Sequence, residues 1–425
     1  MKYFTIGIIA IHLLILTQLR FEVWPEMMLM PYLMKNGFEL YRDMIVPWTP
    51  GLMWILNGWF SLVGLSVDGL KLLTWGTIAG IDSLIYCIAS KKWGKKAGLA
   101  ALTFFVFLQP VFDGNGMWFD LAAVPFLLLA FYWRQPLLLA PAFLVKQSAI
   151  WLSPLALLTS EKYQILLKLK YLILGLAVVI GGSMAWFWSR GTLNDYWFWA
   201  YDFAFRKFPE MVGHRDLGNW RLWILALAPF VLVWVIRGTR SIRNISGDPF
   251  YWTILAIPFA LPRFGLFHFQ PAIVFLALTV GSLIKSYKSY KTVKAYFLLS
   301  LFLVYLGFFW YRTIQNQWQK PDRFLEAEVY QLAARVGLET KKEEPVLLVN
   351  APELVYVLAD RLPPKPWLTQ FPWFLELPGF QQDLVAKFKQ QNLDQVFITP
   401  YQNEGEFVPG SYRPKILLEY VSKVK

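Results

Sequence analysis

The chain has 425 residues, of which 56% are hydrophobic, 18% aromatic and only 16% charged. Soluble domains carry about 25% charged residues, so this composition excludes intrinsic disorder and argues against an ordinary soluble enzyme. The single cysteine, Cys87, excludes a disulfide framework and a cysteine-based zinc site. His12, His214 and His268 are too scattered for a HExxH-type site, so we predict no metal site built from histidine or cysteine.

Hydrophobic runs that could cross a bilayer, which takes about 20 residues each, follow one another up to residue 312. About eleven spans are expected within the runs 3–19, 70–90, 97–112, 117–133, 137–158, 171–188, 220–236, 250–261, 271–284 and 293–310. The run 137–158 has two short arms on either side of Lys146, which predicts a tight helical hairpin. The first run lacks a small-residue cleavage site, so we expect it to remain as a signal anchor.

The net charge of +13 comes from the hydrophobic part, where lysine and arginine gather in short loops. A cytoplasmic N-terminus places the basic segments 91–96, 162–170, 237–243 and 285–291 and Arg134 inside the cell. This assignment requires that residues 49–64 form an interfacial or re-entrant helix rather than a span. Because these charges set the orientation, nucleic acid is not expected as a partner. We predict a multi-pass protein of the cell membrane.

From about residue 313 the composition becomes that of a soluble domain. Residues 345–350 and 395–399 are predicted strands, and residues 353–360 and 381–391 are predicted helices. The expected architecture is therefore an all-α polytopic membrane domain over residues 1–312, whose first outer loop covers residues 20–68 and contains interfacial helices. A small extracytoplasmic α/β domain over residues 313–425 follows it.

Two acids, Glu22 and Glu26, come directly after the first span, on a stretch predicted to be a loop stiffened by prolines. Acids among Phe21, Trp24 and Met27 in the interfacial zone are costly unless they are used. The alternative is that both are solvated acids at a helix exit.

Several motifs follow in an order that resembles a known family. They are Glu22, Gly37, Tyr41-Arg42-Asp43, Trp48-Thr49-Pro50-Gly51, Asp120 and Val145-Lys146-Gln147. The order is similar to that of the C-type (GT-C) integral-membrane glycosyltransferases, especially the glycosyltransferase family 39-like branch of protein O-mannosyltransferases and aminoarabinose transferases. The resemblance covers most of the membrane part. The family usually has Asp, often Asp-Glu, where this chain has Glu22-Val23, so Glu26 remains a rival, although the spacing to Gly37 favours Glu22.

The resemblance implies inverting transfer of a hexose or pentose from a polyprenyl-phosphate-sugar to a glycan, lipid or protein acceptor on the extracytoplasmic side. A lipid phosphate leaves as a stabilised anion, so one carboxylate, Glu22 or Glu26, suffices as base. Tyr41, Asp43, Asp113 and Asp120 would then shape the acceptor or sugar pocket. For Asp120 the alternatives are stabilising a helix N-terminus, positioning a sugar hydroxyl or positioning a divalent cation, the one cofactor left open.

Positive charge is needed to hold the donor phosphate. The candidates on the predicted outer side are Lys146, Arg206, Lys207, His214, Arg215, Arg263 and His268. Other interpretations remain for several of them. Arg206 and Lys207 could be a solvated basic pair, Arg263 could snorkel to lipid headgroups, and His268 could be a hydrogen-bonded interfacial histidine.

A polytopic lipid or solute transporter, or flippase, without glycosyl transfer is the rival interpretation. Transporters typically contain inverted or parallel repeats and polar residues at broken helices near the bilayer midplane. The sequence shows no repeat, and its acids concentrate on the predicted outer face.

Overall fold

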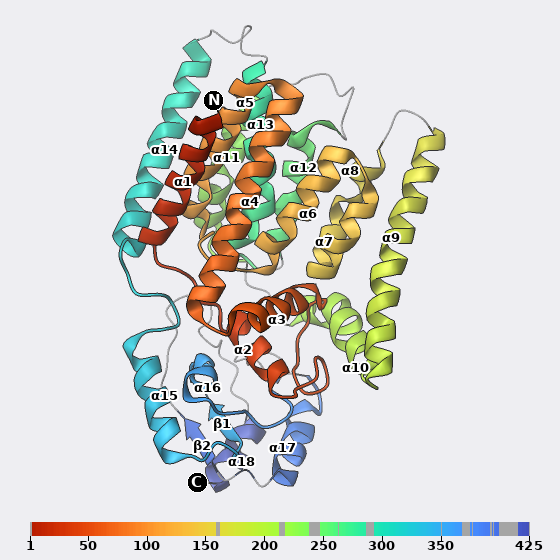
Figure 1. Cartoon of the computed structure of the whole chain (residues 1–425), viewed down its shortest axis with the longest axis vertical. Coiled ribbons are helices and arrows are strands. Elements are labelled where there is room, and N and C mark those ends of the chain that lie inside the picture. Colours follow the sequence, from red (N-terminus) through yellow and green to blue (C-terminus); the bar gives the residue numbers. More distant parts are fainter. Residues whose placement is uncertain are drawn as a thin grey trace. The chain divides into compact units, whose positions relative to one another are not determined.

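The computed structural model describes residues 2–158, 162–211, 217–237, 247–261, 263–285, 293–349, 351–367, 375, 377–391, 393, 395–398 and 415–424. This part of the chain is predominantly helical, with one two-stranded sheet (Figure 1). It divides into two compact units. The first unit comprises Met1–Phe21, Lys71–Gly182 and Leu217–Lys320, and the second comprises Glu22–Leu70, Ser183–Asp216 and Pro321–Lys425.

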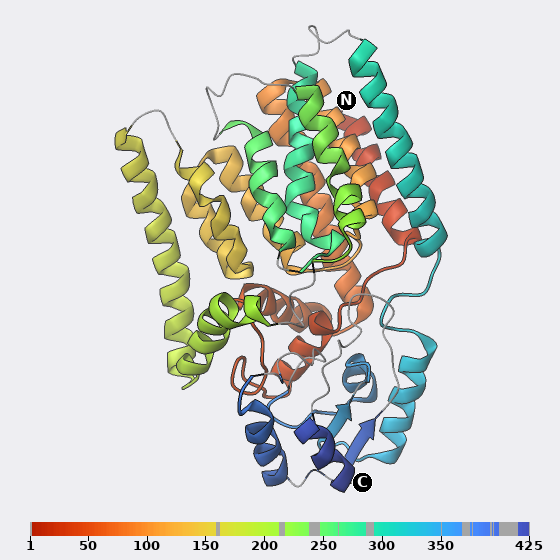
Figure 2. The same ribbon diagram turned by 180° about the vertical axis from the view of Figure 1, so that it is seen from behind.

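The first unit is built from helices, seen from the opposite side in Figure 2. They are α1 (Lys2–Gln18), α4 (Val67–Trp93), α5 (Lys95–Leu108), α6 (Phe119–Trp133), α7 (Leu139–Val145), α8 (Ser153–Leu157), α9 (Lys162–Ser189), α11 (Trp220–Arg237), α12 (Pro249–Ala256), α13 (Gln270–Lys285) and α14 (Val293–Gln317). Short 3-10 helices connect them: η1 (Pro110–Phe112), η2 (Pro136–Leu138), η3 (Gln147–Leu152), η7 (Ile257–Ala260) and η8 (Leu266–Phe269). α4 begins, and α9 ends, in residues assigned to the second unit.

The core of the first unit forms around α13, which packs against α5 and α12. Gly281 makes the close approach of α5 possible, since a Cβ there would lie 2.9 Å from the Ala97 carbonyl oxygen and 3.0 Å from the Ala101 Cβ. In a membrane, where little hydrophobic driving force acts between helices, small residues let helix backbones approach closely and pack well. The predicted hairpin at 137–158 is confirmed as short helical arms on either side of Lys146.

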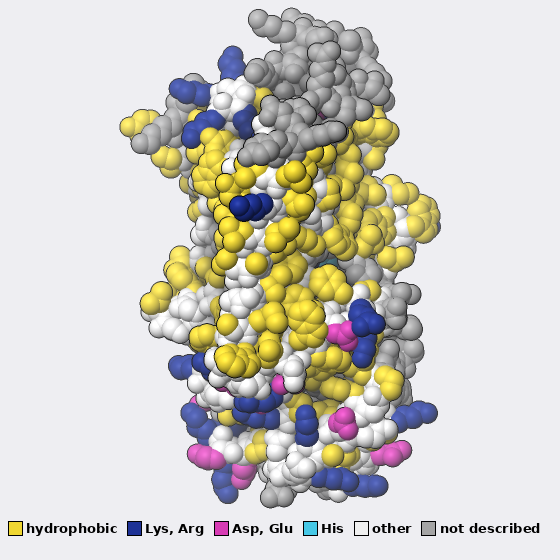
Figure 3. Space-filling view, turned by 90° about the vertical axis from the view of Figure 1, so that its right-hand side faces the viewer, with side chains coloured by type: hydrophobic (Ala, Val, Ile, Leu, Met, Phe, Trp, Pro, Cys, Tyr) yellow, Lys and Arg dark blue, Asp and Glu magenta, His cyan; other side chains and the backbone are white. Residues whose placement is uncertain are grey.

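Four helices in the described residues are long and apolar enough to cross a membrane. They are Val67–Trp93, Gln164–Ser189, Trp220–Arg237 and Leu266–Ile284. Other apolar helices of the described residues, such as Tyr3–Gln18 and Phe119–Trp133, are only 10 to 17 residues long, so the expected total of eleven spans stays a prediction. Figure 3 shows hydrophobic side chains gathered on one face, as expected where lipid is the solvent. The chain is a membrane protein, and the direction in which it crosses stays a prediction.

The second unit combines the segment Glu22–Leu70 with the segment Ser183–Asp216 and the C-terminal residues. Its elements are α2 (Pro25–Lys35), α3 (Gly51–Val63), α10 (Leu193–Trp197), the π-helix η4 (Phe198–Lys207), η5 (Phe208–Glu210), α15 (Ala327–Glu339), β1 (Val346–Val349), α16 (Leu354–Ala359), α17 (Phe380–Gln390), β2 (Gln395–Ile398) and α18 (Lys415–Val424). Both predicted strands and both predicted C-terminal helices are confirmed to within about two residues, and α3 confirms the helix expected at 49–64.

Two segments that the sequence prediction placed in outer loops contain helices that it did not locate. Residues 25–35 form α2, which begins at Pro25 and contains Pro31. Proline at the first helical position is well tolerated because its missing N–H has no partner there. Residues 193–210, within a stretch taken as an outer loop, form α10, η4 and η5. The predicted domain boundary at residue 312 stays a prediction.

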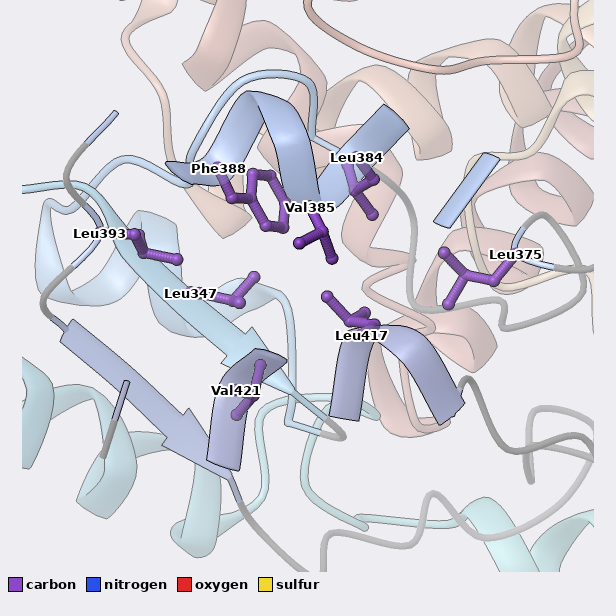
Figure 4. Close-up of a cluster of buried hydrophobic side chains, with 8 residues drawn as sticks. All are labelled: Leu347, Leu375, Leu384, Val385, Phe388, Leu393, Leu417 and Val421. Atoms are coloured by element: carbon purple, nitrogen blue, oxygen red, sulfur yellow. The ribbon is translucent and has the colours of Figure 1, made fainter. Parts of the chain in front are cut away.

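Strands β1 and β2 pair in parallel, with Val346 opposite Gln395. Parallel pairing requires a crossover connection, and α16 and α17 lie between the two strands in the sequence. Figure 4 shows the apolar cluster that covers this sheet. Its buried members are Leu347, Leu375, Leu384, Val385, Phe388, Leu393, Leu417 and Val421. The C-terminal module therefore has a hydrophobic core of its own.

Candidate functional site

Three residues predicted separately from the sequence meet in the first unit. Asp120 lies in the first turn of α6, Lys146 ends α7 with extended backbone, and His268 lies in η8 just before α13. Lys146 Nζ donates to Asp120 Oδ1 at 2.5 Å, and His268 Nδ1 lies 2.7 Å from Asp120 Oδ2. We call Asp120, Lys146 and His268 the carboxylate cluster.

The members of the carboxylate cluster differ in their exposure. The Asp120 side chain is fully buried, whereas the side chains of Lys146 and His268 remain 12% and 13% exposed. A buried carboxylate requires partners, and each oxygen of Asp120 has one. The arrangement therefore combines a buried negative charge with two partly exposed side chains that carry nitrogen donors.

Aromatic rings border this edge. The Phe259 ring centroid lies 5.5 Å from Lys146 Nζ, and the Phe267 ring centroid lies 4.1 Å from that of His268. Such walls lower the local dielectric and strengthen electrostatic contacts with an anion. Arg263, which is half-buried, acts electrostatically on His268 and adds positive charge nearby.

Asp113, the other predicted acid of this region, has a different contact. It adopts a left-handed conformation at φ 48° and accepts a hydrogen bond from Gln317 Nε2 at 3.1 Å. This bond joins the loop before α6 to the end of α14. The predicted role of Asp113 in the pocket stays a prediction.

The sequence prediction missed Asn115, which lies between two glycines in the same loop. Its Nδ2 donates to the carbonyl oxygens of Leu16, Leu19 and Arg20 at 3.0 to 3.1 Å. Its Oδ1 accepts from Trp75 Nε1 at 3.0 Å. Asn115 thus fixes the residues that end α1. The only signal for this role in the sequence was an amide side chain flanked by two glycines, which let the backbone approach its neighbours closely.

In the second unit, Glu22 is buried and forms an ion pair. Arg323 Nη1 donates to Glu22 Oε2 at 3.1 Å, and the Arg323 guanidinium lies 5.0 Å from the Phe324 ring centroid. Sequence reasoning missed Arg323, because 301 positions separate the two residues. Nothing local in the sequence predicts such a contact.

Glu26 lies in the first turn of α2 and is 3% exposed. Its Oε2 is buried and has no hydrogen-bond partner among the described residues. Burial raises the pKa of this carboxyl from 4.5 to about 7. A carboxyl with that pKa can accept or release a proton near neutral pH.

The other two predicted pocket residues of this unit are already engaged. Tyr41 is buried, its hydroxyl donates to the Trp48 carbonyl oxygen at 2.8 Å, and its ring packs on Phe187 at 5.0 Å. Asp43 accepts from Lys365 Nζ at 2.9 Å. Burial alone would raise the pKa of Asp43, but hydrogen bonds from Lys365, the Glu39 amide and Arg42 outweigh it, and the pKa lies below its usual range.

Arg206 and Lys207, predicted to hold phosphate, lie in the second unit at the end of η4. Arg206 is 80% exposed and pairs with Asp202 at 3.0 Å, and Lys207 Nζ lies 4.9 Å from the Phe198 ring centroid. His214 and Arg215 lie outside the described residues. In the described part of the chain, no group of three His, Cys, Asp or Glu side chains could hold a metal ion.

Comparison with known proteins found no matching family model and no significantly similar curated sequence. Two similar solved structures are archaeal oligosaccharyltransferases from Archaeoglobus fulgidus. AglB in complex with an inhibitory peptide and a dolichol-phosphate has a TM-score of 0.47 and 11% identity, over 93% of this chain and 69% of that chain. A complex with Zn and sulfate has a TM-score of 0.44 and 12% identity, over 84% and 62%.

Both neighbours are oligosaccharyltransferases by name. Both TM-scores lie below 0.5, so these structures do not assign a function to this chain. The function must therefore be inferred from the residues of this chain.

Proposed function

We propose that the protein is a membrane glycosyltransferase that transfers a sugar from a polyprenyl-phosphate-linked donor to a glycan, lipid or protein acceptor on the extracytoplasmic side, with inversion. The observation that supports it best is the carboxylate cluster. Asp120 is fully buried and holds Lys146 and His268 at 2.5 and 2.7 Å, while both nitrogen-bearing side chains keep an accessible edge.

The cluster has the chemistry that a departing lipid phosphate requires. Cleavage of the bond between the sugar and the phosphate leaves negative charge on the phosphate oxygens, and preorganised donors stabilise that charge. Lys146 would donate to a phosphate oxygen, and His268 would donate through Nε2 when it is protonated. Because Asp120 already orients both side chains, little reorganisation is needed when the donor binds.

The base that accepts the proton of the acceptor hydroxyl is one of two acids. Glu22 is favoured by its spacing to Gly37, and its contact with Arg323 fixes the orientation of its carboxylate. Glu26 is favoured by its unbonded oxygen and by its pKa of about 7. The proposal needs only one of them, since the lipid phosphate leaves without protonation.

The test uses the purified protein in nanodiscs with a panel of radiolabelled polyprenyl-phosphate-sugars. We expect sugar-dependent release of polyprenyl phosphate, at least 100-fold slower in Lys146→Gln, since one lost donor to developing negative charge typically costs a factor of 100 or more. Lys207→Gln is the matched control and should keep full activity if the cluster alone binds the phosphate. No release from any donor and acceptor tried would refute the proposal.

A proton-linked lipid or solute transporter is the second candidate, and one observation favours it. His12 and Asp82 are fully buried in α1 and α4, and His12 Nδ1 lies 2.9 Å from Asp82 Oδ2. Ionisable pairs inside membrane helices often mark ion or proton pathways. Proton-dependent solute uptake by proteoliposomes that Asp82→Leu abolishes, without sugar transfer, would support this candidate.

A further inference from the structure

A group of basic side chains lies at the other end of α6 from the carboxylate cluster. Lys91 and Lys92 are in the last turn of α4, Arg134 follows the last residue of α6, and Lys168 lies near the start of α9. We call these four residues the basic cluster. All of them belong to the first unit. Fourteen residues of helix separate Asp120 from Arg134, which corresponds to about 21 Å.

Arg134 lies close enough to two other members of the basic cluster to repel them. Arg134 acts electrostatically on both Lys92 and Lys168, although the three residues come from different helices. No ion pair with an acid is present for any of the four in the described part of the chain. Asp248, a described acid of the predicted cytoplasmic loops, is bonded to Arg237.

Lys92 is the least satisfied member. Its Nζ is buried and, within the described residues, has no hydrogen-bond acceptor. It lies 4.0 Å from the Phe131 ring centroid, and Lys91 Nζ lies 5.6 Å from that of Tyr132. The face of an aromatic ring attracts a cation, but it does not accept hydrogen bonds from the three N–H groups of an ammonium as an oxygen atom does. The partial negative charges at the ends of α4 and α6 compensate only part of the positive charge.

Hydrophobic surface adjoins the basic cluster. Trp133 precedes Arg134 and is 54% exposed, and Leu166, two residues before Lys168, is 67% exposed. Charges beside exposed apolar side chains fit a ligand that has an anionic head and hydrocarbon chains. A free phosphate ion would use only the charges and leave the apolar surface uncovered.

We propose that the basic cluster is a binding site for the phosphate headgroup of an anionic phospholipid, with its acyl chains beside α6 and α9. The phosphate oxygens would bond to the exposed Lys91 and Arg134 side chains. The negative charge would also offset the repulsion that Arg134 exerts on Lys168 and on the buried, unsatisfied Lys92. Basic pockets between membrane helices are suited to such headgroups. The site is independent of the proposed sugar transfer, because it lies at the opposite end of α6 from Asp120.

The experiment compares lipid binding by wild type and variants in the full-length protein purified in detergent. Native mass spectrometry and thermal unfolding are recorded with added dioleoyl phosphatidylglycerol, with dioleoyl phosphatidylcholine and with inorganic phosphate. The test variant is Lys92→Gln combined with Arg134→Gln. The matched control is Lys95→Gln combined with Lys96→Gln, which removes the same charge from exposed positions at the start of α5.

We expect phosphatidylglycerol, but not phosphatidylcholine, to bind and to raise the unfolding temperature of wild type and control. In the test variant the dissociation constant should rise about thirtyfold, since each basic group near a headgroup contributes a factor of about five. If the double variant does not fold, Arg134→Gln alone, at an exposed position, should show a rise of about fivefold.

Three results would overturn the proposal. One is equal phosphatidylglycerol binding by wild type and test variant. Another is an equal loss of phosphatidylglycerol affinity in the test variant and the control, which would indicate that the charges attract lipid only through the overall positive potential of the protein. The third is stabilisation by inorganic phosphate alone to the same extent, which would assign the site to a free anion.

Discussion

The carboxylate cluster permits a test that separates the structural contribution of Lys146 from its catalytic contribution. Asp120 is fully buried and accepts two hydrogen bonds, so Asp120→Asn would leave the Lys146 ammonium almost buried and without its carboxylate. Breaking a buried ion pair by removing one partner costs about 3–5 kcal/mol of unfolding free energy. Lys146→Gln would leave the Asp120 carboxylate without its ammonium partner and with His268 as its remaining partner among the described residues, and we expect a cost in the same range.

The informative variant replaces both charges. In Asp120→Asn combined with Lys146→Gln, two neutral amides of similar size can hydrogen-bond to each other, and the coupling in a double-mutant cycle should recover most of the lost stability. Activity should not recover, because no cation would remain at position 146 to stabilise the leaving phosphate. Stability is measured as the thermal midpoint in detergent, and activity as release of polyprenyl phosphate under single-turnover conditions.

The outcome that refutes this reasoning is recovery of activity together with stability. It would mean that Lys146 serves only to neutralise Asp120 and that the phosphate is held elsewhere. A double variant as unstable as either single variant would instead show that geometry, rather than charge balance, holds the three segments together.

Three other predictions concern stability. Glu26 has a folded-state pKa of about 7 against 4.5 for the unfolded chain, so its contribution to stability is fully present below about pH 4.5 and is lost as the pH rises through 7. The total loss in unfolding free energy is about 3 kcal/mol. Glu26→Gln should abolish this pH dependence, which is measured as the thermal midpoint against pH. Asn115→Ala removes three hydrogen bonds to carbonyl groups at the end of α1 and should cost about 1–3 kcal/mol in the same assay, with unchanged stability contradicting the role assigned to Asn115. Gly281→Leu forces α5 away from α13 and should cost about 1–3 kcal/mol or prevent folding, whereas Gly76→Leu, where a Cβ meets nothing within 4 Å, is the tolerated control.

Local sequence patterns predict several elements of the second unit correctly. Alternation and amphipathic spacing over 4 to 11 residues were enough to predict β1, β2, α16 and α17, because such patterns are local properties of the chain. The helix α2 was missed because Pro25 and Pro31 are signals for turns when read without their neighbours. Packing of α2 against α16, to which the Tyr32 hydroxyl contributes a hydrogen bond of 3.0 Å to Asp360, overrides that signal.

The sequence by itself determined that this is a hydrophobic, helical membrane protein with a small α/β module, since composition and periodicity respond directly to the solvent that each segment meets. It also identified Asp120, Lys146 and His268 as separate candidates. Only the tertiary structure decided that these three meet, that Glu22 pairs with Arg323, and that four cations without an acidic partner among the described residues gather near the ends of α4, α6 and α9. The physical reason is that these contacts join residues from 26 to 301 positions apart, and helix packing brings them together without leaving a local pattern.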